Sequence, residues 1–117
     1  MRSVIKKYED FATNDSDPIF RTQFFVVIMR PTKWPNDAKY GIRVTKKTVG
    51  KHATKRNFAK RRLRELIREF ENKLSRDHDY IFVARAAILD ADYQHLRQMM
   101  AMALKKIKHE NSAAVLD

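Results

Sequence analysis

The sequence contains no cysteine, which excludes disulfide bonds and thiolate metal sites. It contains only two glycines, Gly41 and Gly50, so a glycine-rich phosphate loop is excluded as well. No stretch approaches the roughly 18 apolar residues of a membrane span, and the N-terminal residues MRSVIKKYEDF lack the apolar run of a signal peptide. We therefore expect a soluble, cytoplasmic protein.

Metal-ligating residues are few and scattered. The four histidines, at positions 52, 78, 95 and 109, show no zinc-site spacing. Asp77, His78 and Asp79 form a cluster that could hold Mg²⁺ as in a nuclease, but polar residues are expected anyway at a helix-to-strand connection. We predict no catalytic residue and no metal ligand in this chain.

Acidic residues are also scarce relative to basic ones. The chain has 14 Asp and Glu against 25 Lys and Arg, a net charge of +11. Its 117 residues, 44% of them hydrophobic, indicate one folded domain over residues 1–117 rather than a disordered basic tail. A domain of this charge is expected to bind an anionic polymer, and nucleic acid is the leading candidate.

Most of the net positive charge lies in residues 46–68, KKTVGKHATKRNFAKRRLRELIR. This segment holds ten Lys and Arg and one acid, Glu65. Its second half has the spacing of a helix with separate faces. One face is apolar and suits a core: Ala59, Leu63, Leu66, Ile67, Phe70 and Leu74. The adjoining face is basic: Asn57, Lys60, Arg61, Arg64 and Arg68.

A basic helix face is often no more than solvated surface. Here, however, five neighbouring polar positions include four cations with few acids at i,i+4 spacing to pair with them. This arrangement indicates a phosphate-binding surface, with Asn57 able to hydrogen-bond a base or a 2′-hydroxyl.

The remaining pattern predicts a small α+β sandwich, in which a mixed sheet of about four strands packs against three helices. We expect strands at residues 24–29, 40–45 and 80–84, with a further short strand near 19–22. Helices are expected over residues 1–12, over the basic segment, and from about 92 to 108, with a disordered tail at 109–117. Alternation in the second strand places Arg43 and Lys47 on one exposed sheet face.

Three blocks of the sequence resemble the protein component of bacterial ribonuclease P. They are GIRVTKK at 41–47, KRNFAKRRLRE at 55–65 and DYIFVAR at 79–85, with FFVV at 24–27 as a fourth similarity. The resemblance implies a subunit that binds a large catalytic RNA and precursor tRNA, and helps to remove the 5′ leader. It also implies that Mg²⁺ is held mainly by the RNA and the substrate, and that a left-handed βαβ crossover surrounds the basic helix.

The resemblance also implies roles for individual residues. Those expected to bind the catalytic RNA are Lys46, Lys47, Lys55, Arg56, Asn57, Lys60, Arg61, Arg64 and Arg68. Those expected to bind the leader are Phe11, Phe25, Val26, Ile28, Arg43, Lys47 and Arg85. The cleft formed by the second set is expected between the first helix and the sheet.

The chain departs from the family pattern at three positions. Phe58 stands where arginine is usual, and Asp15 and Pro18 replace an aromatic residue and a glycine after the first helix. We expect weaker or differently placed leader contacts at that end of the cleft.

Other functions remain open. A ribosomal or ribonucleoprotein assembly protein would use the same basic helix without serving a reaction. An autonomous metal-dependent nuclease would need a carboxylate cluster. A DNA-binding module would need a recognition helix in a suitable frame.

Overall fold

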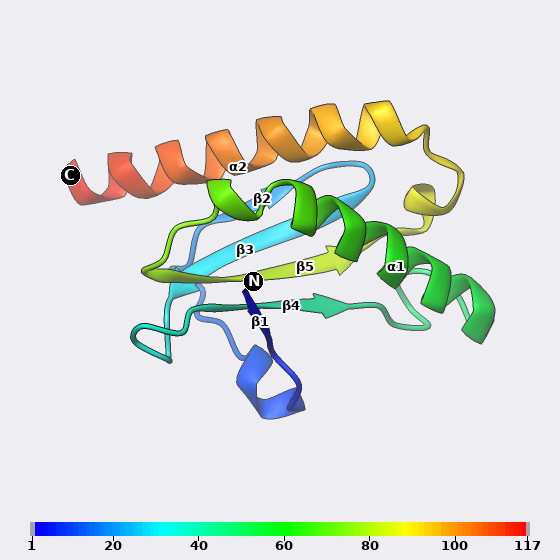
Figure 1. Ribbon diagram of the computed structural model, residues 1–117, viewed down its shortest axis with the longest axis horizontal. Helices are drawn as coiled ribbons and strands as arrows, with labels where there is room; N and C mark the ends of the chain where they lie inside the picture. Colours follow the sequence, from blue (N-terminus) through cyan, green and yellow to red (C-terminus); the bar gives the residue numbers. More distant parts are fainter. Residues whose placement is uncertain (1, 117) are drawn as a thin grey trace.

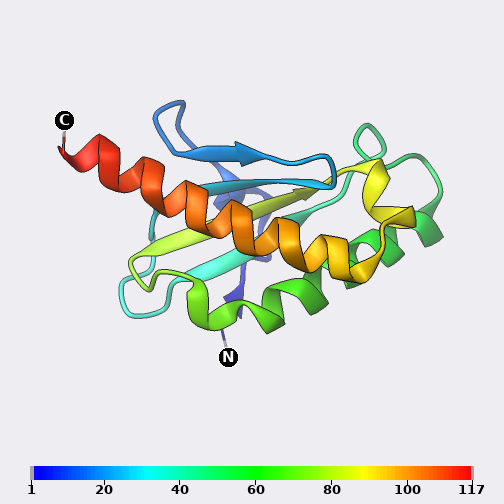
Figure 2. The same ribbon diagram turned by 90° about the horizontal axis from the view of Figure 1, so that it is seen from above.

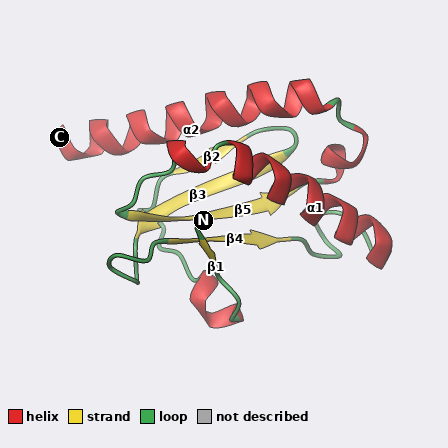
Figure 3. Ribbon diagram, viewed as in Figure 1, coloured by secondary structure: helices red, strands yellow, loops and turns green. Residues whose placement is uncertain are grey.

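The computed structural model describes residues 2–116, and describes side chains for residues 2–108. Within this range the chain forms five strands, two α-helices and three short 3₁₀ helices (Figure 1, Figure 3). The strands are β1 (Ser3–Val4), β2 (Ile19–Arg21), β3 (Phe25–Pro31), β4 (Lys39–Arg43) and β5 (His78–Ala84). The helices are η1 (Tyr8–Phe11), α1 (Ala53–Glu69), η2 (Glu71–Lys73), η3 (Ala86–Asp90) and α2 (Tyr93–Leu116).

The described strands form one mixed sheet in the order β1-β4-β5-β3-β2. β3 and β5 are rich in β-branched and aromatic residues, which favour strands, and pair antiparallel near the centre. β2 is antiparallel to β3, β4 is parallel to β5, and β1 adds a short parallel strand to β4. The predicted fold class is confirmed.

The connection from β4 through α1 to β5 is a left-handed crossover. In Figure 1 both strands run from left to right, β5 lies above β4, and α1 returns in front of them. Figure 2, a view from above, also places α1 on the side of β4 and β5 that faces the viewer in Figure 1. Right-handed crossovers are the rule for parallel strands, so this feature could be expected only from the family resemblance.

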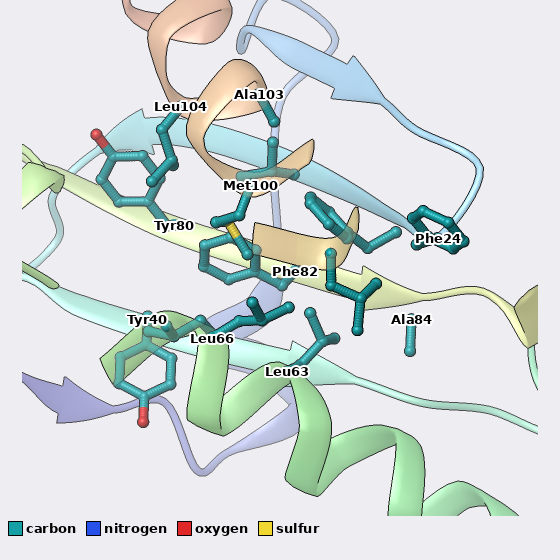
Figure 4. Close-up of a cluster of buried hydrophobic side chains, with 14 of the residues drawn as sticks. Phe24, Tyr40, Leu63, Leu66, Tyr80, Phe82, Ala84, Met100, Ala103 and Leu104 are labelled. Atoms are coloured by element: carbon teal, nitrogen blue, oxygen red, sulfur yellow. The ribbon is translucent and has the colours of Figure 1, made fainter. Parts of the chain in front are cut away.

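Both α-helices cover the same face of the sheet. Alternate residues of β3 and β5, such as Phe25 and Phe82, are fully buried in one cluster with Leu63 of α1 and Met100 of α2. Figure 4 shows these helix side chains converging on β5. Because side chains alternate along a strand, the residues between them point to the opposite face, which neither α-helix covers.

The helix predicted over residues 1–12 is wrong. Residues 3–4 form β1, the backbone N–H of Ile5 donates to Tyr40 O at 2.7 Å, and only the 3₁₀ turn η1 follows. Pairing with the edge of β4 satisfies this backbone and buries Ile5, whereas an isolated helix of this length is marginal. The described chain therefore has five strands and two α-helices, instead of about four strands and three helices.

The other predicted elements occur close to their expected positions. α2 continues to Leu116, so it includes residues 109–116 of the segment that we predicted to be a disordered tail. Residue 117 lies outside the described residues. Over the described residues, no helix has both the length and the apolar character needed to cross a membrane.

Candidate nucleic-acid interface

The exposed side of α1 carries the predicted basic residues. Ala59, Leu63, Leu66 and Ile67 are buried and hold one side of α1 against the sheet. The opposite side then faces solvent. We call its exposed cations, together with Asn57, the cationic strip: Asn57, Lys60, Arg61, Arg64 and Arg68. Lys55 is also exposed, but it lies on another side of α1, where it lines a pocket with Leu89 of η3.

Its cations have no carboxylate partner. Among the described side chains, ion pairs within 4.0 Å are confined to Arg30–Asp79, Lys39–Asp37 and Arg97–Glu69. The strip is thus a row of hydrated, mutually repelling charges on a rigid scaffold. Such a row is stabilised by an anionic polymer laid along it.

The turn before α1 carries two more exposed lysines. Lys46 and Lys47 are exposed, and the backbone N–H of Thr48 donates to Thr45 O at 3.2 Å to close the turn around them. Gly50 has a φ of 126°, a conformation that side-chain-bearing residues rarely adopt. Arg56 is only half-exposed, and its Nη1 donates to Gly50 O at 2.9 Å. Arg56 therefore positions this turn.

The uncovered face of the sheet forms a second surface, which we call the open face. Its side chains are aligned across strands by the register: Val26 with Val83 and Arg43 in one row, and Ile28 with Ile81 in the next. Val26, Ile28 and Val83 are partly exposed even though they are apolar. Such a surface can take an apolar or aromatic ligand group, with a cation at its edge.

The 3₁₀ turn η1 adds aromatic rings to the open face. The Arg43 guanidinium lies 6.0 Å from the ring centres of both Tyr8 and Phe11. Tyr8 is 84% exposed, so its ring is accessible to a ligand bound on the open face. Tyr8 is not among the residues predicted to bind the leader, because the packing of η1 against the sheet decides its place.

Four of the predicted leader-binding residues, Phe11, Val26, Ile28 and Arg43, lie on the open face. Arg85 follows β5 on the same side as Val83, and its Nη1 donates to Thr22 O at 3.1 Å. Lys47 lies beyond the end of β4, in the exposed turn that leads to α1.

Phe25 does not belong to this group. Its side chain is fully buried on the helix-covered face, since it alternates with Val26 along β3. Its predicted place in the leader site is wrong.

The departures at Asp15 and Pro18 fall in an exposed turn between η1 and β2. Asp17 N–H donates to Asn14 O at 3.0 Å, and Pro18 O accepts from Met29 N–H at 3.0 Å. This stretch therefore continues the edge of the sheet instead of extending η1.

Asp79 has a structural role. Its carboxylate is fully buried and accepts from Arg30 Nε at 3.2 Å, Thr32 Oγ1 at 2.8 Å, and the backbone N–H groups of Lys33 and Lys39 at 3.1 and 2.8 Å. These bonds use the acceptor capacity that a metal would need. Asp77 is exposed, and the described residues contain no group of three potential metal ligands.

Comparisons with known proteins agree with this geometry. Residues 2–108 match the family Ribonuclease P. The ribonuclease P protein component of Erythrobacter litoralis is 34% identical over 108 residues, covering 91% of this chain and 86% of that protein. The counterpart from Nitratiruptor sp. is 37% identical over 89 residues, covering 76% of each.

Solved structures show the same fold. The Staphylococcus aureus RNase P protein superposes with a TM-score of 0.74 at 27% identity, covering 92% of this chain and 97% of that one. The RNase P protein from Thermotoga maritima, at 22% identity and a TM-score of 0.61, shares the fold. The chain belongs to the family of bacterial ribonuclease P protein components.

Proposed function

We propose that this chain is the RNA-binding protein subunit of a ribonuclease P that removes the 5′ leader from precursor tRNA. The cationic strip binds the catalytic RNA, and the open face binds the leader. The observation that carries this proposal is the cationic strip itself: exposed guanidinium and ammonium groups without carboxylate partners, on a helix anchored by its apolar side. Such groups neutralise phosphates and release counterions.

The two surfaces differ in chemistry, which supports separate binding sites for the catalytic RNA and the leader. The strip offers charge and an amide, which suit the backbone of a large folded RNA. The open face offers exposed aromatic and aliphatic groups beside Arg43, which suit an unpaired strand whose bases are free to stack. Since α1 covers the other face of the sheet, both RNAs can be bound at once.

The leader site consists of Tyr8, Phe11, Val26, Ile28 and Arg43, with Arg85 and Lys47 at its ends. Tyr8 and Phe11 supply rings for stacking, and Arg43 pairs with a phosphate while it lies beside those rings. Val26 and Ile28 form the apolar floor.

The Mg²⁺ ions required for cleavage are held by the RNA subunit and the substrate. The side chains of this chain do not fit them well, because the Asp79 carboxylate is already saturated by protein donors. The chain contributes binding and positioning of the two RNAs.

Site-specific photocrosslinking tests this assignment. A photoreactive amino acid is placed at Arg64, at Val26, or at Met102 of α2 as the control, in a complex with a bacterial ribonuclease P RNA and precursor tRNA. We expect Arg64 to crosslink to the catalytic RNA, Val26 to the leader, and Met102 to neither. Crosslinks from Arg64 to the leader, or from Val26 to the catalytic RNA alone, would contradict the assignment of the two RNAs to the two surfaces.

A further inference from the structure

Phe58 is a partly exposed aromatic residue that lies beside two cations of α1. It belongs to α1, is 37% exposed, and has the guanidinium carbons of Arg61 and Arg62 at 5.8 and 5.4 Å from its ring centre. A ring between guanidinium groups is a common platform for an RNA base.

A small pocket opens beside this ring, between α1 and η3. It has a volume of about 300 Å³ and is lined by Thr54, Lys55, Phe58, Leu89 and Asp90. This volume lies at the lower end of the range for small-ligand pockets and is large enough for a nucleobase. Phe58 and Leu89 supply its apolar surface, and the other three supply polar groups.

The pocket is held open by a link between its two walls. Arg62 Nη2 donates to Ala91 O at 2.7 Å, which ties α1 to the segment directly after η3. Ile88 of η3 is fully buried and fixes the second wall to the core. A site that exists before binding costs less to occupy.

We propose that this pocket binds a single unpaired nucleobase, with guanine preferred, which stacks on Phe58 and hydrogen-bonds to Asp90. The inference rests on the proposed RNA binding by the cationic strip, which lies on a neighbouring side of the same helix. Lys55 neutralises the phosphate next to the base, and Asp90 faces the Watson–Crick edge. Guanine is preferred because it presents two adjacent donors, N1–H and N2–H, to one carboxylate, whereas adenine and cytosine each present a single amino group.

Short fluorescent oligouridines with one central guanine, adenine or cytosine test the proposal, with plain oligouridine for comparison. We expect the unaltered chain to bind the guanine oligomer several-fold more tightly than the others. Phe58→Ala should weaken binding of that oligomer by about fivefold or more, since stacking on one ring supports about that much affinity.

Two further variants separate stacking from charge. Phe58→Arg adds a cation, so it should keep overall binding and steepen the salt dependence, yet lose the preference for guanine. Asp90→Asn should keep the ring but bind guanine and adenine equally. Met102→Ala, which removes an apolar group of equal 37% exposure on α2, should change nothing.

Equal affinity of the unaltered chain for all four oligomers would contradict guanine binding by the pocket. A guanine preference that survives in Phe58→Arg would contradict it as well. The Arg61→Ala/Arg64→Ala double variant shows which claim has failed. If it weakens all four complexes while the Phe58 variants change none, the strip binds RNA and the pocket does not. If it too changes nothing, RNA binding by the strip has failed.

Discussion

The ring of Phe11 lies against Gly41 of β4, where a side chain would block it. A methyl group added to Gly41 would lie 2.4 Å from Cε1 of Phe11 and 3.2 Å from Cβ of Ile5. The absence of a side chain at Gly41 thus lets η1 place its aromatic rings on the open face beside Arg43.

Gly41→Ala should therefore displace Phe11. We expect the affinity for precursor tRNA with a leader to fall by about fivefold or more, because a stacking ring is lost. Overpacking should also cost about 1–3 kcal/mol of folding free energy. Fluorescence anisotropy of the assembled enzyme with leader-bearing and leaderless tRNA measures the first effect, and urea denaturation the second.

Leaderless tRNA and the catalytic RNA serve as internal controls for this variant. Their affinities should stay unchanged, since neither contacts the open face. Equal weakening for tRNA with and without a leader would show that Phe11 does not contact the leader.

Arg61→Ala and Arg64→Ala should each weaken binding to the catalytic RNA and flatten its salt dependence. Each lost phosphate contact should reduce the slope of log K against log salt concentration by about 0.7–0.9. Filter binding across a salt series gives both quantities. Lys105→Ala, an exposed cation on α2, is the matched control. Unchanged affinity and slope in both arginine variants would refute the assignment of the cationic strip.

Asp79→Ala should destabilise the fold by about 3–5 kcal/mol, because Arg30 is then left as a buried charge without its partner. Arg30 is only 3% exposed, so solvent cannot replace the carboxylate. Denaturant unfolding measures this loss. Asp77→Ala, an exposed neighbour, should change stability by less than about 0.5 kcal/mol.

In cleavage assays below its unfolding temperature, Asp79→Ala should retain Mg²⁺-dependent activity. Specific loss of activity in the folded variant would instead indicate that Asp79 is a metal ligand.

Stability should decline at high pH in part through Tyr80. Burial raises the pKa of Tyr80 above the ordinary 10.0, against smaller opposing effects of the hydrogen bond from Ser75 N–H and of the Arg2 charge. The folded state then holds the phenol proton more tightly than the unfolded chain does. This contribution is complete below the unfolded pKa and is lost as the pH rises toward the folded one.

Tyr80→Phe should flatten this decline. Unfolding free energies measured from neutral pH to above pH 10 should fall less steeply in the variant than in the unaltered chain. Parallel curves would show that Tyr80 ionises equally in both states.

Local patterns predicted the parts of the fold that depend on one segment. The apolar period of α1 is long enough to identify both the helix and the exposed side of Arg61 and Arg64. The alternation in β4 likewise placed Arg43 on the face away from the helices. In each case the chain neighbours decide which side chain is buried.

The features that local sequence patterns could not predict depend on pairing between segments that are far apart in the chain. The spacing of Val4, Ile5, Tyr8 and Phe11 fits a helix, but the edge of β4, far away along the chain, takes Ile5 into the sheet. The exposure of Tyr8 follows from that pairing. The family resemblance implies leader binding by both Phe25 and Val26, although alternation along β3 allows only one of the two on each face of the sheet.

The central claim is that this chain serves a reaction carried out by RNA. The direct measurement is cleavage of a precursor tRNA at low Mg²⁺ by the purified chain alone, by a bacterial ribonuclease P RNA alone, and by both together. The account predicts efficient release of the leader, with a mature 5′ end, only when both are present. Cleavage by the chain alone, or no stimulation of a cognate RNA by the chain, would contradict it.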